Sequence, residues 1–169
     1  MSIALFQAIL FYVFGALALG AALVVVAQRN PTYSAFALIV TLVSLAAVFG
    51  LLGSPFIAAL QIVVYAGAIM VLFLFVLMLL NVRTEVRASG EGRVFKLVAI
   101  AFGAVLVGEI GSVLMAARPT LAAGFDASAR EVARLLFEAQ YLYVFEATSI
   151  LILASLVGAI ALAKRDPSP

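Results

Sequence analysis

Long apolar runs separated by short polar segments dominate this chain. Five runs occur, at residues 3–27, 33–52, 56–80, 95–117 and 141–163. A bilayer core needs about 20 helical residues to cross it, and each run is long enough. The pattern predicts an all-α integral membrane protein with five transmembrane helices, organised as a single membrane domain over residues 1–169. No basic residue precedes the first run, so it is expected to be a retained transmembrane helix rather than a signal peptide.

Polar breaks separate the runs, and the last of them contains a further helical pattern. Asn30 and Pro31 end the first run, and a Gly-Ser-Pro turn at 53–55 predicts a tight hairpin between antiparallel helices. In the long connection at 118–140, Ser128 and Glu131 have the spacing of a capping box. Apolar residues follow at i, i+3, i+4 and i+7: Val132, Leu135, Leu136 and Ala139. This pattern predicts a short amphipathic helix on the membrane surface, between the fourth and fifth transmembrane helices. The alternative is a loop with accidental periodicity.

Composition supports a membrane protein and excludes several kinds of chemistry. Hydrophobic residues make up 67% of the chain and charged residues 11%, against about 45–50% apolar and about 25% charged in soluble domains. The chain has no cysteine and no histidine, which removes disulfides and the usual zinc or haem ligands. No nucleophile–base pair or glycine-rich phosphate loop is visible. We therefore expect no catalytic residue, no bound metal or cofactor, and lipid rather than nucleic acid as a partner.

The distribution of basic residues between the loops predicts the orientation. With five spans, one side of the membrane holds most of them: Arg29, Arg83, Arg87, Arg93, Lys96, Lys164 and Arg165. The other side holds only Arg118, Arg130 and Arg134, all in the longer loop. The positive-inside rule then places the N-terminus outside and the C-terminus in the cytoplasm.

The third run has a polar patch and a glycine that a simple membrane anchor would not need. Gln61 and Tyr65 are one helical turn apart, and Gly67 lies two residues further on. A glycine in a helix interior costs about 1 kcal/mol relative to alanine. A span of surplus length with a weak middle can tilt, kink or absorb an extra residue as a π-bulge. Gln61 and Tyr65 are therefore candidate polar residues of a water path, although the Tyr65 hydroxyl could simply bond a neighbouring helix.

Two acids lie inside predicted spans. Glu109 is in the fourth run, and Glu146 is one to two turns inside the fifth. A charged acid near the bilayer centre costs about 2.5 kcal/mol or more, so such residues are rare and often functional. Both are candidates for a proton path. Alternatively, each is an interfacial acid that reaches outward or pairs with a loop arginine.

The sequence of the third run resembles that of the subunit J family of respiratory NADH–quinone oxidoreductase, the bacterial counterpart of mitochondrial chain 6. The resemblance is carried by residues 61–78, QIVVYAGAIMVLFLFVLM. It extends to Asn30-Pro31 before the second run, and to Leu136-Phe137 followed by Tyr141 and Glu146. Glu109 belongs to no family pattern, and the segment 138–140 lacks the tighter turn expected before the last helix, which leaves the start of that helix open by a turn.

The resemblance implies a membrane-arm subunit of a proton-pumping complex in the bacterial inner membrane. Its partners would be other membrane subunits, including the quinone-module and antiporter-like subunits. FMN, iron–sulfur clusters, NADH and a quinone would belong to the parent complex, with no cofactor in this chain. In that family the third helix can hold a π-bulge around the motif tyrosine, here Tyr65. A switch between π-bulged and regular helix would rotate the residues that follow, including Val71 and Phe75, and gate a hydrated link, with Gly67 softening the helix.

Two other functions remain open at this point. The chain could be a purely structural assembly subunit of that complex. It could also be the equivalent subunit of a related antiporter or hydrogenase complex.

Overall fold

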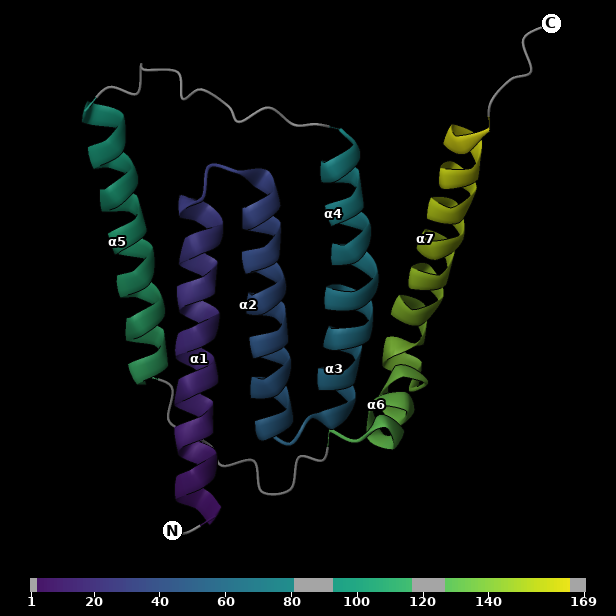
Figure 1. The fold of residues 1–169 in the computed structure, drawn as a ribbon. Helices are drawn as coiled ribbons and strands as arrows, with labels where there is room; N and C mark the ends of the chain where they lie inside the picture. The colour runs from purple at the N-terminus through teal and green to yellow at the C-terminus, as the bar shows by residue number, and fades with distance from the viewer. Residues whose placement is uncertain (1–2, 81–92, 117–126, 165–169) are drawn as a thin grey trace, which may run out of the picture.

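The computed structural model describes residues 3–80, 93–116 and 127–164, and helices account for nearly all of them (Figure 1). The elements are α1 (Ile3–Ala27), α2 (Pro31–Leu51), α3 (Pro55–Leu60), the π-helix η1 (Gln61–Ile69), α4 (Met70–Leu79), α5 (Arg93–Ala116), α6 (Ala129–Leu136) and α7 (Ala139–Ala163). Because α3, η1 and α4 follow one another without a break, they form one continuous span, called the third span below. Five helices of the described part are long and apolar enough to cross a membrane, as the apolar runs predict.

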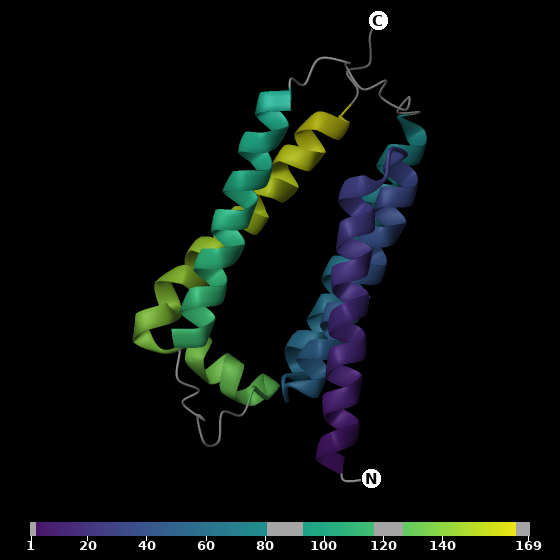
Figure 2. The same ribbon diagram turned by 90° about the vertical axis from the view of Figure 1, so that its left-hand side faces the viewer.

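The first three spans form one layer with α2 in the middle. α2 packs along α1 on one side and along the third span on the other (Figure 1). α5 and α7 stand off from this layer when the molecule is turned by 90° (Figure 2), and none of their residues whose side chains the structure describes is buried. The packed interior therefore lies along α2, which holds four of the buried residues: Ala35, Thr41, Ser44 and Ala46.

The α1–α2 hairpin is fixed by polar contacts at its turn. Asn30 caps α2, because its side-chain oxygen accepts a hydrogen bond from the Thr32 backbone N–H at 3.0 Å. Pro31 occupies the first helical turn, where its missing N–H costs nothing. The Ser34 hydroxyl then donates to the Val25 carbonyl in the last turn of α1, at 2.8 Å. Helix α2 therefore starts at Pro31, two residues before the predicted position 33.

The α2–α3 turn is a Schellman motif. The Ser54 N–H donates to the Phe49 carbonyl and the Gly53 N–H to the Gly50 carbonyl. Gly53 has φ +78°, a left-handed conformation that glycine adopts without strain. Pro55 starts α3 directly afterwards. A Cβ added to Gly50 would lie 3.9 Å from the Ala58 Cβ, so the two antiparallel helices meet closely at this end.

A short helix, α6, follows Ser128 where the capping-box pattern predicts one, while its location on the membrane surface stays a prediction. It turns directly into α7, and the rings of Phe137 and Phe145 pack across the turn with centroids 5.1 Å apart. The Glu138 carbonyl accepts hydrogen bonds from two backbone N–H groups of the first turn of α7. α7 therefore begins at Ala139, two residues before the predicted 141, and Glu146 is its eighth residue.

The described ends of the chain agree with an odd number of spans. The start of α1 and the end of α7 lie at opposite ends of the helix layer (Figure 1). Which end faces the cytoplasm stays a prediction. The basic residues at 83 and 87, Arg118 and Arg165, on which the orientation partly depends, lie outside the described residues, as does the predicted last residue of the fourth span, 117.

Candidate functional site in the third span

The third span changes its hydrogen-bond register in the middle. At the end of α3, the Gln61 N–H donates to the carbonyls of Ala58 and Ile57, three and four residues back. At the end of η1, the Met70 N–H donates to the Tyr65 carbonyl, five residues back. Five-residue spacing defines a π-helix, which is rare and frequently found at functional sites. The π-helix covers Gln61–Ile69 and thus includes three of the predicted site residues, Gln61, Tyr65 and Gly67.

The wider turn of η1 is visible in which side chains are covered. From Ala58 to the end of the span, the covered positions are Ala58 and Gln61, then Ala66, Met70, Leu74 and Leu77, and α2 is the helix that packs along this span. Every step is three or four residues except that from Gln61 to Ala66, which is five. A regular α-helix would continue the Gln61 face with Tyr65. Instead Ala66 is 8% exposed and Tyr65 is 52% exposed.

Gly67 sits at the tightest point of this register. A Cβ added there would lie 3.1 Å from the Ile62 carbonyl oxygen, five residues back. That distance is tighter than nine in ten real Cβ contacts. The glycine therefore allows the backbone to close the π-turn without displacing the carbonyl.

The residues beyond the π-helix that were predicted to rotate point away from α2. Val71 is 43% exposed and Phe75 is 54% exposed, and the two are one turn apart on α4. Tyr65, Val71 and Phe75 therefore present an uncovered side of the third span, whereas Ala66 and Met70 present the side packed on α2.

The two buried hydroxyls of α2 donate hydrogen bonds within α2 itself. The Thr41 hydroxyl donates to the Ala37 carbonyl at 3.0 Å, and the Ser44 hydroxyl donates to the Val40 carbonyl at 2.7 Å. Both hydroxyl protons are used inside α2. The contact between α2 and the third span therefore depends on packing of small and apolar side chains.

The two candidate acids are not brought to the third span. Glu109 lies on α5 and Glu146 on α7, both exposed. They share a local arrangement, because in each case the backbone carbonyl of the glutamate accepts a hydrogen bond from the serine three residues later: Ser112 at 2.8 Å and Ser149 at 2.7 Å. Within the described ranges, no three acidic, histidine or cysteine residues are close enough to hold a metal ion.

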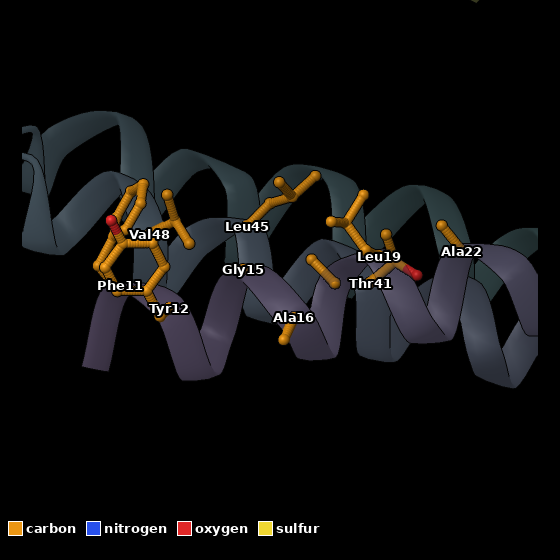
Figure 3. Close-up of a pocket in the computed structure, with 10 residues that line it drawn as sticks. Phe11, Tyr12, Gly15, Ala16, Leu19, Ala22, Thr41, Leu45 and Val48 are labelled. Carbon is orange, nitrogen blue, oxygen red and sulfur yellow. The ribbon is translucent and has the colours of Figure 1, made fainter. Parts of the chain in front are cut away.

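A separate apolar groove of about 620 Å³ runs between α1 and α2 (Figure 3). Its walls include Tyr12, Gly15 and Leu19 from α1, and Leu45 and Val48 from α2. None of the predicted site residues lines it. The groove and the π-helix are therefore distinct features of the layer.

The sequence alone did not single out Ala66 and Met70, the two buried residues whose positions identify the π register of the third span. Both are apolar members of an apolar helix, and no polar or periodic signal distinguishes them. Only the five-residue step from Gln61 to Ala66 identifies them, and that step depends on the backbone.

Comparison with known proteins gives consistent matches along most of the chain. Residues 20–162 match the family described as NADH-ubiquinone/plastoquinone oxidoreductase chain 6. NADH-quinone oxidoreductase subunit J of Rhodobacter capsulatus is 34% identical, over 92% of this chain and 80% of the relative. Subunit J of Pseudomonas aeruginosa is 38% identical, over 92% and 96%. Subunit J of Escherichia coli is 35% identical, over 92% and 86%.

Proposed function

Because this chain belongs to the NADH-ubiquinone/plastoquinone oxidoreductase chain 6 family, and is thus a membrane subunit of an NADH–quinone oxidoreductase, we propose that it couples quinone reduction to proton translocation. The proposed device is a switch of the third span between the π-helix and a regular α-helix. The observation that carries the proposal is the π-helix at Gln61–Ile69, with its five-residue bond from Met70 to Tyr65.

The geometry gives this switch a defined effect on the neighbouring side chains. Removing the extra residue from the π-turn advances the helix by one position, which is about 100° of rotation at 3.6 residues per turn. If α3 stays in place, Tyr65 moves toward the α2 face that Ala66 occupies now. Val71 and Phe75 rotate with α4. The switch thereby moves the Tyr65 ring and hydroxyl to the covered face, whereas Val71 and Phe75 stay off the α2 face and turn by about 100°.

The chemistry of electron transfer would belong to other subunits. We propose that FMN, the iron–sulfur clusters, NADH and the quinone are bound there, and that this chain carries no active site. Its partners would be the quinone-module and antiporter-like membrane subunits, and its location the bacterial inner membrane. The uncovered sides of α5 and α7 support extensive contacts with such neighbours.

The direct test is a density map of the assembled complex in two functional states, one resting and one turning over with NADH and quinone. We expect residues 62–71 to have the π register in one state and α register in the other. A single unchanged register in all states would contradict the switch and leave a structural role in assembly.

Substitution of Tyr65 tests the function separately from assembly. Tyr65→Phe keeps the ring and removes the hydroxyl, and we expect proton pumping and NADH–quinone turnover to fall severalfold while native gels show a normal amount of complex. Tyr12→Phe is the matched control, because Tyr12 is an exposed membrane tyrosine on α1, 73% exposed and outside the π-helix. Loss of activity only in proportion to loss of assembled complex would favour the scaffold function instead.

A further inference from the structure

Glu146 lies well inside the last span. α7 has 25 residues and is therefore about 37 Å long, against a hydrocarbon core of about 30 Å. Glu146 is seven residues beyond the start of the helix at Ala139, which places it about 10 Å along the axis. In a helix centred on the bilayer, its Cα is about 7 Å below the edge of the hydrocarbon. This depth places the backbone of Glu146 inside the hydrocarbon core.

The carboxylate has no hydrogen bond or ion pair with any other residue that the structure describes. The nearby hydroxyls are used within α7: Ser149 donates to the Glu146 backbone carbonyl at 2.7 Å, and Thr148 donates to the Val144 carbonyl at 2.8 Å. A charged residue at this depth costs about 2.5 kcal/mol or more, and such residues normally pair inside a helix bundle. Glu146 therefore requires a partner from beyond the described residues.

The two sides of α7 differ in the size of their side chains, and this difference indicates where the partner of Glu146 packs. Thr148, Ser155 and Ala159 share one side, and small residues of this kind let helices approach closely in a membrane. Glu146 is on the opposite side, above a stripe of large residues at i+4, i+7, i+11 and i+14: Ile150, Leu153, Val157 and Ile160. These four side chains are 60–67% exposed. Without the acid this stripe would suit lipid, but the acid makes lipid a poor environment for it.

We propose that the stripe headed by Glu146 is an interface with a transmembrane helix of another subunit, which carries a lysine or arginine at the depth of Glu146. Charge complementarity selects a basic residue, because a cation offsets the carboxylate and satisfies its oxygens. The apolar stripe below Glu146 gives the partner helix a continuous apolar side of α7 to pack against. α7 would then be held between two neighbours, one on each side. This inference requires membership in the complex but not the register switch of the third span.

The experiment uses the assembled complex in its native membrane. A photo-crosslinking amino acid at Leu153, in the middle of the stripe, is expected to give one main adduct, with a transmembrane segment of another subunit that contains a lysine or arginine. Glu146→Leu should lower the amount of assembled complex at least about fivefold, because it leaves the partner's cation buried and unpaired. Glu131→Leu on α6 is the control acid and should leave assembly unchanged. Exchanging the charges, with lysine at 146 and glutamate in the partner, should restore assembly.

Four results would overturn the interface. Adducts with lipid alone, or with a helix that lacks a basic residue, would remove the proposed partner. Normal assembly of Glu146→Leu with normal activity would mean that Glu146 needs no partner. Normal assembly with reduced proton pumping would make Glu146 part of a proton path instead. If Arg118→Leu gives the same assembly defect and the charge exchange does not restore assembly, Glu146 pairs with Arg118 of this chain and not with another subunit.

Discussion

Replacing Gly67 by alanine tests whether the missing side chain maintains the π register. In that register the new Cβ would lie 3.1 Å from the Ile62 carbonyl oxygen, so the carbonyl must move by a few tenths of an ångström. In the α register, Ile62 bonds the residue before Gly67, and an alanine at 67 has the ordinary surroundings of any helical alanine. The substitution therefore penalises one register and not the other.

The size of the effect follows from two terms. Alanine is favoured over glycine in helices by about 1 kcal/mol, but both registers are helical, so this term stabilises both and leaves their ratio unchanged. The remaining term is the crowding at Ile62. Small excesses of volume in packed sites cost about 1 kcal/mol at the low end of the observed range. At 1.4 kcal/mol per factor of ten, the ratio of π to α register should fall about fivefold.

The measurement is the fraction of particles in each register in density maps of the assembled complex, sorted at residues 62–71, for the parent protein and Gly67→Ala. Gly103→Ala is the control, because a Cβ at Gly103 has no heavy atom within 4 Å, and it should leave the ratio unchanged. NADH–quinone turnover should fall in Gly67→Ala with assembly preserved. An unchanged or larger π fraction in Gly67→Ala would refute the argument that the Ile62 contact sets the register.

Three further substitutions test the packing around α2. Ala66→Leu should destabilise the contact with α2 by about 1–3 kcal/mol through overpacking, so the assembled complex should be lost at a lower temperature. Ala68→Leu, on the exposed side, is the control and should have little effect on that temperature. Ser34→Ala removes the donor to the Val25 carbonyl and should cost about 1 kcal/mol; an unchanged midpoint in the same thermal assay would argue against a stabilising bond. Gly53→Ala forces a side chain into φ +78° and should cost about 1–2 kcal/mol. Its midpoint should shift by at least as much as that of Ser34→Ala, and the opposite order would contradict the strain argument.

The sequence predicts the five spans well because membrane helices require only length and continuous apolarity. α1 has the predicted ends, Ile3 and Ala27. The largest differences are at the starts of α2, α5 and α7, which begin two residues early. In α2 and α7 a polar residue, Asn30 or Glu138, occupies the cap position, and the first residue of α5 is the charged Arg93. Runs drawn from apolar residues alone exclude such a first turn.

The π-helix is the feature that sequence reasoning located but could not describe. Surplus length and Gly67 indicate a weak point between Gln61 and Met70, and η1 lies there. The register itself depends on whether Tyr65 or Ala66 packs against α2. That choice is made by the fit between two helix surfaces, which the order of apolar residues along the chain does not contain.

For α5 and α7, the sequence predicts the helices but not what surrounds them. Both are apolar enough to be predicted from the sequence, yet neither has a buried residue in the described part of the chain. In the proposed function these side chains would contact other subunits and lipid. The fold of one chain therefore does not explain why Glu109 and Glu146 are where they are.

The construction of α2 explains how one helix of the layer could rotate without disturbing the rest. Its first turn is tied to α1 by the bond between Ser34 and Val25, and its end is closed by the Schellman motif at Gly53. Its buried hydroxyls bond only to its own backbone, so no side-chain hydrogen bond joins α2 to the third span within the described residues. Beyond the turn that connects them, packing holds these two helices together. A rotation of the third span would therefore break no side-chain hydrogen bond with α2, and its cost would be the exchange of the packed Ala66, Met70, Leu74 and Leu77 for the residue before each of them, which at the first position is Tyr65.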